Sequence, residues 1–512
     1  MSDIYLYNRQ LNKETDYNVW MGFPGCTAFS LSSLGFMWLY KGLDEEQGIN
    51  VERVCTDTKI THIKLQDLDA ICFSFSFDMD FVAIFEMLDK YNIPLKSKER
   101  DESHPLVFCG GPVVTANPEP YKEFFDFIVI GDGDKCNLEV IKICREAKLE
   151  GKTKLETLNM LYQLNGVYVP SMPKKEVKKC HFDLSECVYT PIISDESFFQ
   201  NTFIVEVSRG CFNRCGFCVA SYLNLPVRFV EYETIIKNID LGLRYTNKIA
   251  LLGALISAHP RFNDICEYIY NKIENGQNIE MSVSSLRADA ITPSVIKTLV
   301  AAGQKNTTIA IEAASERLRK TVNKNLTEQQ IFDAVKIAKE GGLNGIKIYS
   351  MLGLPTETQE DIDEFIRLGK DLKAANKGFD ITFSFSTFVP KPHTPFQWCK
   401  KDSIKSLENK QNYLKKELHK IGMKPKFSSP KWDYYQAVLS RGDSSLTEYL
   451  IEVYRQGAKL GAYKSAAKKY SINTDKFIDS IPDINQELPW DFILLNPGKE
   501  FLKNEYMRLI NS

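Results

Sequence analysis

Three cysteines with metal-binding spacing are the residues of this chain best suited to chemistry. Cys211, Cys215 and Cys218 form a Cys-x3-Cys-x2-Cys run. Three thiolates hold three irons of a cubane [4Fe–4S] cluster and leave the fourth iron open to a small molecule. An electron-transfer cluster is normally closed by four cysteines, and a structural zinc site also takes four ligands. The sequence near this run contains no fourth Cys or His, so the spacing predicts a reactive cluster.

Two other interpretations of the run stay open, namely three buried free thiols and an unrelated zinc site. Chance gives this spacing in roughly 0.8% of chains with such a cysteine content. The spacing is therefore specific.

The run resembles the signature of the radical S-adenosylmethionine (SAM) enzymes, in which an aromatic residue precedes the last cysteine, as Phe217 does here. The resemblance implies that the open iron chelates the amino and carboxylate groups of SAM. It also implies that reduction of the cluster cleaves SAM to methionine and a 5'-deoxyadenosyl radical, which abstracts hydrogen from a substrate. A reductant protein of the flavodoxin or ferredoxin type is then an expected partner.

The segment from 201 to 400 must position this loop, and it alternates apolar strands with longer helices. Strands are predicted at 202–207, 248–253, 279–284, 307–312, 344–351 and 381–388. Six such strands indicate a partial (β/α)6 barrel, the fold that the resemblance implies, with chemistry at the carboxyl ends of the strands.

Candidate cofactor-binding residues follow these predicted strands. The resemblance places backbone at Gly253 against the amino group of SAM, where a side chain would block the approach. Ser284 and Arg287 follow the third strand, and Glu312 ends the fourth. Glu312 matches a strand-end glutamate of related radical SAM proteins, which can accept hydrogen bonds from the ribose or ammonium group of the ligand. The carboxylate of the ligand is expected to pair with Arg287 or Arg319. The sequence identifies no catalytic acid or base.

The first 135 residues also alternate strands and helices. Strands are predicted at 50–55, 70–76, 106–112 and 125–134, and helices at 30–43 and 79–90. Short continuous apolar runs are typical of buried parallel strands, so we expect an N-terminal doubly wound, Rossmann-like sheet.

Glycines at the predicted strand ends extend the resemblance to a cobalamin-binding-type domain. Gly110, Gly111 and Gly131 would let backbone approach a bulky ligand, and simple tight turns are the alternative explanation. Cobalamin domains that ligate cobalt from below use an Asp-x-His-x-x-Gly motif, which the contexts of His62 and His104 lack. Any cobalamin is therefore expected to bind without a lower protein histidine, and loss of the cofactor stays open.

The predicted organisation is a cobalamin-binding-like α/β domain at 1–135, a connector at 136–200, a radical SAM partial barrel at 201–400 and a helical C-terminal domain at 401–512. The formal charge is -2, which indicates no nucleic-acid partner. The sequence shows no signal peptide and no run of 18 apolar residues, so no membrane partner is expected. Thirteen cysteines in 512 residues are too sparse for a disulfide scaffold. A cytoplasmic location is expected.

Three hypotheses for function follow. The first is a radical SAM enzyme that uses a [4Fe–4S] cluster and SAM, extended in one version to methyl transfer through cobalamin. The second is a methylthiotransferase-like enzyme acting on RNA or protein, which needs a second cluster; Cys26, Cys72 and Cys109 are the available ligands. The third is a non-catalytic iron–sulfur electron-transfer or scaffold protein. The substrate has no motif and cannot be named from the sequence.

Overall fold

The computed structural model describes residues 3–9, 13–481 and 483–511. The chain forms two units, and each is built from separate stretches of sequence. Unit 1 comprises residues 1–201, 438–477 and 485–496, and unit 2 comprises residues 202–437, 478–484 and 497–512. The segment at 136–200 thus belongs to unit 1, and the segment at 401–512 is divided between the two units. The predicted domain boundaries at 135, 200 and 400 stay predictions.

A six-stranded sheet forms the centre of unit 1. In spatial order its strands are β3 (Gly48–Cys55), β2 (Thr15–Phe23), β4 (Ala70–Ser74), β5 (Leu106–Gly110), β6 (Phe127–Val129) and β7 (Val167–Tyr168). The first five strands are parallel, and β7 pairs with β6 in the antiparallel direction. Chain order reverses between β2 and β4, which makes the carboxyl ends of these two strands the topological switch point where ligands bind in such sheets.

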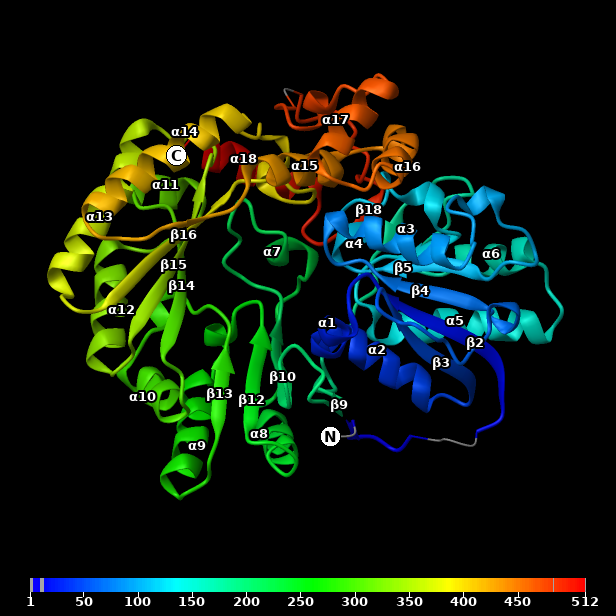
Figure 1. Ribbon diagram of the computed structural model, residues 1–512, viewed down its shortest axis with the longest axis horizontal. Helices are drawn as coiled ribbons and strands as arrows, with labels where there is room; N and C mark the ends of the chain where they lie inside the picture. Colours follow the sequence, from blue (N-terminus) through cyan, green and yellow to red (C-terminus); the bar gives the residue numbers. More distant parts are fainter. Residues whose placement is uncertain (1–2, 10–12, 482, 512) are drawn as a thin grey trace. The chain divides into compact units, whose positions relative to one another are not determined.

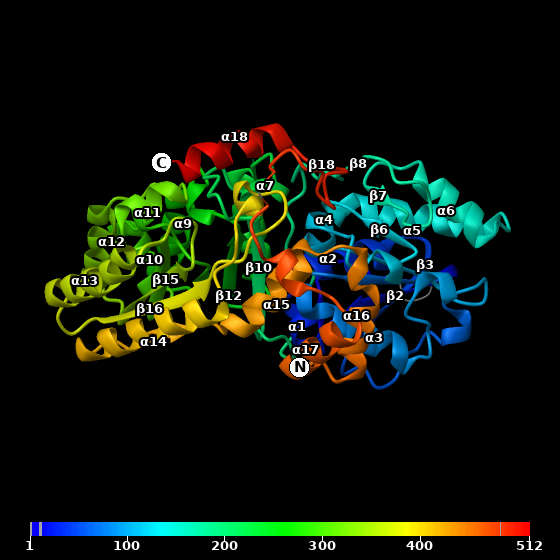
Figure 2. The ribbon, with the colours of Figure 1, turned by 90° about the horizontal axis from the view of Figure 1, so that it is seen from above.

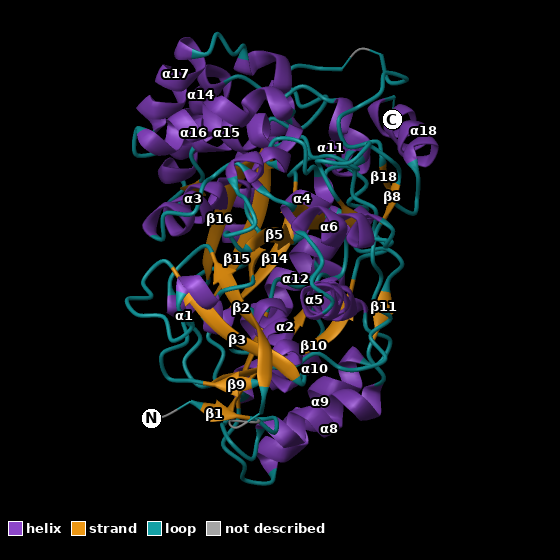
Figure 3. Ribbon diagram, turned by 90° about the vertical axis from the view of Figure 1, so that its right-hand side faces the viewer, coloured by secondary structure: helices purple, strands orange, loops and turns teal. Residues whose placement is uncertain are grey.

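Helices cover both faces of this sheet (Figure 3). The helices α2 (Leu34–Glu45) and α5 (Gly133–Leu149) share a buried apolar cluster with Val19 and Met21 of β2. Trp20 points to the opposite face because side chains alternate along a strand. Its ring lies 4.6 Å from that of Tyr91, at the end of α3 (Phe81–Lys90). The predicted doubly wound sheet is therefore confirmed.

The remaining elements of unit 1 are short or peripheral. They include α1 (Thr27–Ser32), α4 (Pro112–Ala116), α6 (Lys154–Tyr162), α16 (Thr447–Arg455), α17 (Leu460–Lys469), and the strand pairs β1 (Ile4–Tyr5) with β9 (Ile192–Ile193) and β8 (Val177–Lys178) with β18 (Ile493–Leu494).

Three elements of unit 1 differ from the sequence prediction. The strand predicted at 125–134 is shorter, because β6 ends at Val129 and α5 already begins at Gly133. The strand β2 was not predicted, because Asp16 and Asn18 interrupt its apolar pattern; Asn18 is satisfied by the carboxylate of Asp69, which accepts its backbone N–H at 2.8 Å. The helix predicted at 30–43 is two helices, α1 and α2, which meet at Ser33, an extended residue.

Residues from the C-terminal part of the chain complete unit 1 beside α3 and α4. The amide of Asn117 donates to the carbonyls of Ser440 and Gly442 at 3.1 and 2.8 Å. The hydroxyl of Ser440 donates to the buried carboxylate of Asp78 at 2.7 Å. Such buried polar contacts fix the position of residues 438–477 against the sheet.

Unit 2 contains the six strands predicted for the partial barrel, each within two residues of its predicted bounds. They are β10 (Thr202–Arg209), β12 (Lys248–Gly253), β13 (Glu280–Val283), β14 (Asn306–Glu312), β15 (Gly345–Leu352) and β16 (Asp380–Thr387). They form two parallel sheets that a single bridge between Leu286 and Ile309 links, and β11 (Arg228–Phe229) and β17 (Lys426–Phe427) lie at the outer edges. The predicted partial barrel is confirmed.

Long helices lie along the outer side of these strands (Figure 1). They are α8 (Tyr232–Gly242), α9 (Phe262–Glu274), α10 (Pro293–Ala301), α12 (Glu328–Glu340), α13 (Gln359–Ala375) and α14 (Ile404–Lys420), and unit 2 also contains the short α7 (Ala220–Leu223) and α11 (Glu316–Thr321), with α18 (Lys499–Ile510). The helix α15 (Pro430–Arg441) runs from unit 2 into unit 1.

Alternation along the strands determines which side chains face these helices. Phe383 of β16 is fully buried, and its ring lies 5.7 Å from that of Phe365 in α13. The neighbouring Ser384 is only half-buried and lines a cavity on the other side of the sheet. The inner side of the barrel is therefore lined by polar and partly exposed residues.

No helix of the described residues is long and apolar enough to cross a membrane.

Of the three glycines predicted to contact a ligand in unit 1, two must be glycine because neighbouring backbone lies too close for a side chain. Gly111 has φ 124°, and a Cβ there would lie 2.5 Å from the carbonyl oxygen of Phe75. Gly131 has φ 105°, and a Cβ there would lie 2.4 Å from the carbonyl oxygen of Cys180. The close approach that the sequence predicted is thus made by backbone of unit 1 at both positions. A Cβ at Gly110 would meet only Val129, at 3.5 Å.

The neighbouring glycines Gly110 and Gly111 make a matched pair for a stability test. We expect Gly111→Ala to lower the free energy of unfolding by about 2 kcal/mol or more, because the new Cβ adds a clash to an unfavourable φ. Gly110→Ala should change it by less than about 1 kcal/mol. Chemical denaturation of the two variants measures the difference, and equal losses would contradict the explanation.

Candidate active site

The three cysteines lie in a loop at the carboxyl end of β10, between that strand and α7. Cys211 and Cys215 are 9% and 6% exposed, and Cys218 is partly exposed. All three are free thiols. The loop begins at Gly210, which has φ 85°. A Cβ at this position would lie 2.5 Å from the carbonyl oxygen of Asn224. The loop thus presents three thiols at the edge of the sheet where the barrel fold carries its chemistry.

Burial makes the thiols of Cys215 and Cys218 poor acids. It raises the pKa of Cys215 to about 12 and also raises that of Cys218. The positive charge of Lys324 acts on Cys215 in the opposite direction and favours its thiolate. A metal that binds these sulfurs must therefore displace their protons.

Among the residues that the structure describes, no group of three His, Cys, Asp or Glu side chains is placed to hold a single metal ion. A cubane cluster takes one thiolate at each of three iron corners, so its ligands need not converge on one point. Three thiols from one buried loop therefore suit the donor set of such a cluster.

Glu312 lies at the end of β14 in a left-handed conformation, with φ 65°. Its Oε1 accepts a hydrogen bond from Lys324 Nζ at 3.0 Å, and both side chains are nearly buried. Burial has the largest single effect and lowers the pKa of Lys324, but the charge and hydrogen bond of Glu312 together with the nearby Cys215 raise the pKa overall. A buried pair of this kind fixes both side chains beside the thiols. The sequence signalled Glu312 but not its partner.

Arg287 lies after β13, near the thiols of Cys215 and Cys211. Its Nε and Nη2 donate to the two carboxylate oxygens of Asp289 at 2.9 and 2.8 Å. It also lines a cavity of about 420 Å³ together with Phe212 and His259. Arg287 is thus held in a fixed orientation at the edge of a hollow next to the cysteine loop, where it can still meet an anionic group.

His259 is bound on both sides of its ring. Its Nε2 lies 2.8 Å from the carbonyl oxygen of Val230, and its Nδ1 accepts from the backbone of Arg261 at 3.1 Å. These contacts orient the ring within the structure.

Gly253, Phe217 and Ser284 lie in three different settings. A Cβ at Gly253 would lie 2.4 Å from Ser208 Oγ on the neighbouring strand, so packing within the sheet already requires a glycine. Phe217 packs against an apolar cluster that includes Leu509 and Phe396. Ser284 is exposed beyond the end of β13.

Arg319 has a structural role that differs from the predicted one. It is fully buried, and its guanidinium donates to the carbonyl oxygens of Ala313, Ala314 and Leu326. A side chain held in this way is not available to the carboxylate of a ligand. The sequence placed it correctly after a strand end but gave no sign that it was enclosed.

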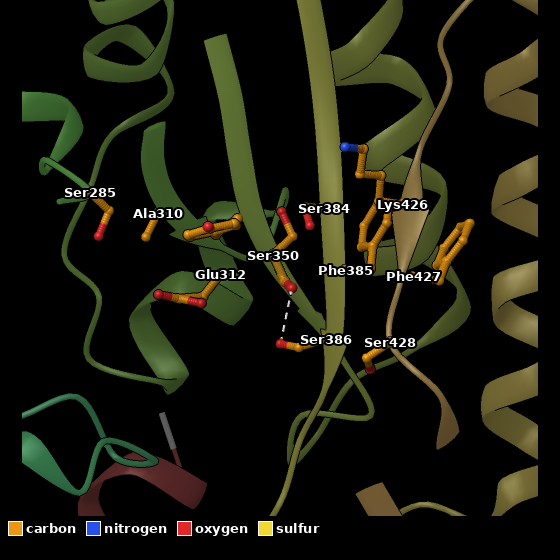
Figure 4. A pocket seen from close by; sticks show the side chains of 11 residues that line it. Ser285, Ala310, Glu312, Ser350, Ser384, Phe385, Ser386, Lys426, Phe427 and Ser428 are labelled. Atoms are coloured by element: carbon orange, nitrogen blue, oxygen red, sulfur yellow. Dashed lines mark hydrogen bonds between the residues drawn. The ribbon is translucent and has the colours of Figure 1, made fainter. Parts of the chain in front are cut away.

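A cavity of about 600 Å³ opens on the inner side of the second sheet (Figure 4). Its lining is rich in serine and consists of Ser285, Ala310, Glu312, Tyr349, Ser350, Ser384, Phe385, Ser386, Lys426, Phe427 and Ser428. Ser386 Oγ donates to the carbonyl oxygen of Ser350 at 3.5 Å. The sequence analysis missed these residues except Glu312, although the polar positions alternate with apolar ones along β15 and β16. The cavity thus offers hydroxyl groups beside apolar and aromatic surface, as ligand pockets commonly do.

Two family models match the chain. Residues 42–170 match the model described as radical SAM proteins, N-terminal, and residues 205–369 match the radical SAM superfamily. Together the matches cover more than half of the chain. This protein therefore belongs to the radical SAM superfamily, whose members use a [4Fe–4S] cluster and SAM.

Relatives of known sequence include proteins with several descriptions. An uncharacterised protein of Methanocaldococcus jannaschii is 28% identical over 85% of this chain and 90% of its own length. An uncharacterised methyltransferase of Pyrococcus horikoshii is 27% identical over 62% of this chain and 68% of its own length. A tRNA-2-methylthio-N(6)-dimethylallyladenosine synthase of Clostridium beijerinckii is 26% identical over 45% of this chain and 50% of its own length.

The fold is similar to that of the cobalamin-dependent SAM radical enzyme OxsB. The OxsB structure with aqua-cobalamin and SAM bound matches 97% of this chain and 79% of its own, with a TM-score of 0.56 and 16% identity. The structure with aqua-cobalamin alone matches 69% of this chain and 52% of its own, with a TM-score of 0.53 and 19% identity. These likenesses show a shared fold.

The buried pair of Glu312 and Lys324 gives a testable stability difference. We expect Lys324→Met to lower the free energy of unfolding by about 3 kcal/mol, because it leaves a buried carboxylate without its partner. Lys320→Met is the control, since Lys320 pairs with Glu316 at an exposed site, and its loss should be below about 1 kcal/mol. Denaturant unfolding of the cluster-free protein measures both, and similar losses would contradict a special role for Lys324.

Proposed function

We propose that Cys211, Cys215 and Cys218 hold three irons of the [4Fe–4S] cluster and that SAM binds at the fourth. The observation that carries this proposal is the placement of three free thiols, two buried and one partly exposed, in one loop at the carboxyl end of β10. The reduced cluster supplies the electron that cleaves SAM to methionine and a 5'-deoxyadenosyl radical. The residues of the chain orient the ligand and bind the substrate.

The side chains around the loop have roles that follow from their charges. Arg287, fixed by Asp289, would bind the carboxylate of SAM. Glu312, neutralised by Lys324, would accept hydrogen bonds from the ribose or the ammonium group. Backbone at Gly253, Phe217 beside Cys218, and Ser284 would complete the SAM site. The serine-rich cavity would hold the substrate, since Glu312 lines it and thus connects the two sites.

We also propose that unit 1 binds cobalamin and that the reaction is a methyl transfer. Exposed phenylalanines lie at the topological switch point, where a parallel sheet of this order binds its ligand. Phe29 lies in α1, which follows β2, and Phe77 follows β4; they are 49% and 48% exposed. The ring of Phe198 lies 4.9 Å from that of Phe29 and 5.2 Å from that of Phe199.

Several exposed aromatic rings at one edge suit a large, flat, partly apolar ligand, because exposed apolar patches mark binding sites. Gly111 and Gly131 are not part of the proposed cobalamin site, because each makes room for neighbouring backbone of unit 1. Gly110 is proposed to contact the ligand. It includes no histidine ligand to cobalt. The methyltransferase description of the Pyrococcus horikoshii relative and the cobalamin bound by OxsB favour the same reaction.

The methylthiotransferase alternative needs three cysteines that converge on a second cluster. In the sheet of unit 1, Cys72 pairs with Phe108, and Phe73 pairs with Cys109. Because neighbouring residues of a strand point to opposite faces, Cys72 and Cys109 lie on opposite faces of the sheet. They cannot share a cluster with Cys26. The structure therefore favours one cluster, and about four irons per chain rather than about eight are expected.

The cellular setting is also proposed. Radical SAM enzymes need an external reductant, and we propose a flavodoxin- or ferredoxin-type protein in this role. Thirteen free thiols suit a reducing compartment, which favours the cytoplasm. A non-catalytic electron-transfer protein would also bind four irons but would not cleave SAM after reduction.

Removing one proposed iron ligand tests the cluster assignment. We expect Cys215→Ala to lose the cluster and all formation of 5'-deoxyadenosine, while circular dichroism shows an intact fold. Cys266→Ala is the control, because Cys266 is a buried thiol in α9 of the same unit. Iron and acid-labile sulfide are measured after anaerobic reconstitution, together with 5'-deoxyadenosine after reduction with dithionite. SAM cleavage retained by Cys215→Ala would refute the assignment.

An aromatic substitution tests the cobalamin proposal. We expect Phe198→Asp to weaken binding of hydroxocobalamin about tenfold or more, because one buried ring contributes about 1.5–3 kcal/mol. Leu149→Asp is the control, since this exposed leucine ends α5 at the opposite edge of the sheet. Absorption spectra after gel filtration measure the bound cobalamin. Equal binding by both variants, or none by the wild type, would exclude the proposed site.

A further inference from the structure

The turn that precedes Cys215 has an unfavourable backbone conformation. Arg214 has φ 50°, a left-handed value that a residue with a long side chain rarely adopts. Such a residue costs of order 1–3 kcal/mol and persists only where its surroundings hold it in place. The direction in which Cys215 points depends on this turn, because the two residues are adjacent. The contacts of the Arg214 backbone therefore indicate what holds the thiol.

The side chain of Asn323 holds this turn from the other side. Its Nδ2 donates to the carbonyl oxygen of Asn213 at 2.9 Å and to that of Arg214 at 3.0 Å. The same Arg214 oxygen accepts from the hydroxyl of Tyr222 at 2.9 Å. One amide group thus bridges two successive carbonyls of the cysteine loop, and its two protons suit this task.

The backbone around Asn323 continues the contact. Cys215 Sγ donates to the carbonyl oxygen of Asn323 at 3.7 Å, and the N–H of Gly216 donates to that of Val322 at 3.1 Å. Asn323 itself has φ 57°, a conformation that asparagine tolerates better than most residues. Asparagine therefore suits both requirements of the position, a left-handed backbone and a double donor.

The helix α18 supports this arrangement from outside and lies next to α11 (Figure 2). Arg508 Nη2 contacts Asn323 Oδ1 at 3.4 Å, which fixes the amide so that its Nδ2 points to the loop. The guanidinium of Arg214 lies 4.9 Å from the ring centroid of Phe501. Leu509 packs at Gly216, where an added Cβ would lie 3.0 Å from its side chain.

We propose that Asn323 is a positioning residue for the iron–sulfur cluster, and that α18 holds it in that role through Arg508. Asn323 fixes the strained turn at Arg214 so that Cys215 is presented together with Cys211 and Cys218. This inference rests on the proposed assignment of the three cysteines. It extends that assignment to a residue about 100 positions away in the sequence, whose side chain needs no contact with iron.

Three substitutions separate the side chain of Asn323 from its backbone. Asn323→Gly keeps the left-handed backbone accessible and removes only the amide. Asn323→Asp keeps the shape but places an oxygen against two carbonyl oxygens. Lys320→Met is the control, because Lys320 is an exposed residue of the same segment that pairs with Glu316.

The first measurement uses cluster-free full-length protein, so it does not depend on enzyme activity. Site-resolved mass spectrometry follows alkylation of Cys215 by iodoacetamide, with the buried thiol of Cys266 as an internal reference. We expect the ratio of the two rates to rise about tenfold in Asn323→Gly and more in Asn323→Asp, and to stay unchanged in Lys320→Met. The reference corrects for general loss of stability, because global unfolding would expose both thiols.

The second measurement follows the cluster after anaerobic reconstitution. We expect both Asn323 variants to bind fewer than four irons per chain and to show an altered electron paramagnetic resonance spectrum after reduction, while Lys320→Met matches the wild type. Wild-type alkylation, iron content and spectrum in Asn323→Gly would overturn the inference, even if Asn323→Asp fails to fold. If the wild-type protein itself binds no cluster, the assignment of the cysteines fails, and the alkylation ratio still decides whether Asn323 holds the turn.

Discussion

The chemistry of this protein depends on keeping three thiols together inside an apolar setting without a disulfide or a single shared ion. Burial raises the pKa of the Cys215 and Cys218 thiols, which disfavours the thiolate forms that bind iron. Before a metal binds, the chain itself must hold the loop in position. It does so with hydrogen bonds to the loop backbone and with the charge of Lys324. The loop is therefore organised by residues from distant parts of unit 2, and its spacing alone does not make the site.

The inner side of the barrel is open because the barrel has six main strands and is not closed. In a closed eight-stranded barrel, branched apolar side chains fill the interior. Here the bridge between Leu286 and Ile309 links the two sheets, and serines occupy inward positions of β16. Small polar side chains leave space and offer hydrogen bonds. The ends of the strands and the interior between them can then act as one site.

The sequence predicted the positions of the strands of unit 2 along the chain well, because each strand is a short, largely apolar run bounded by polar turns. It failed at β2, where Asp16 and Asn18 hide a central strand whose partners come from elsewhere. It also located residues near the site without revealing their partners. Arg319 looked like a ligand for a carboxylate, yet three backbone carbonyls enclose it, and no local pattern records such a contact. No sequence pattern indicated a role for Asn323, because its contacts are with a turn about 100 residues earlier.

The interleaving of the two units has a consequence for biosynthesis. The sheet of unit 1 needs residues 438–477 and 485–496, which a ribosome makes only after nearly all of unit 2. The hydrogen bonds that Asp78 and Asn117 form with Ser440 become possible only after more than 300 further residues have been translated. The cysteine loop likewise emerges long before α18. During much of its synthesis the nascent chain therefore has incomplete hydrophobic cores, and exposed cores of this kind need protection by chaperones. The cluster can be inserted only late, after α18 has been made.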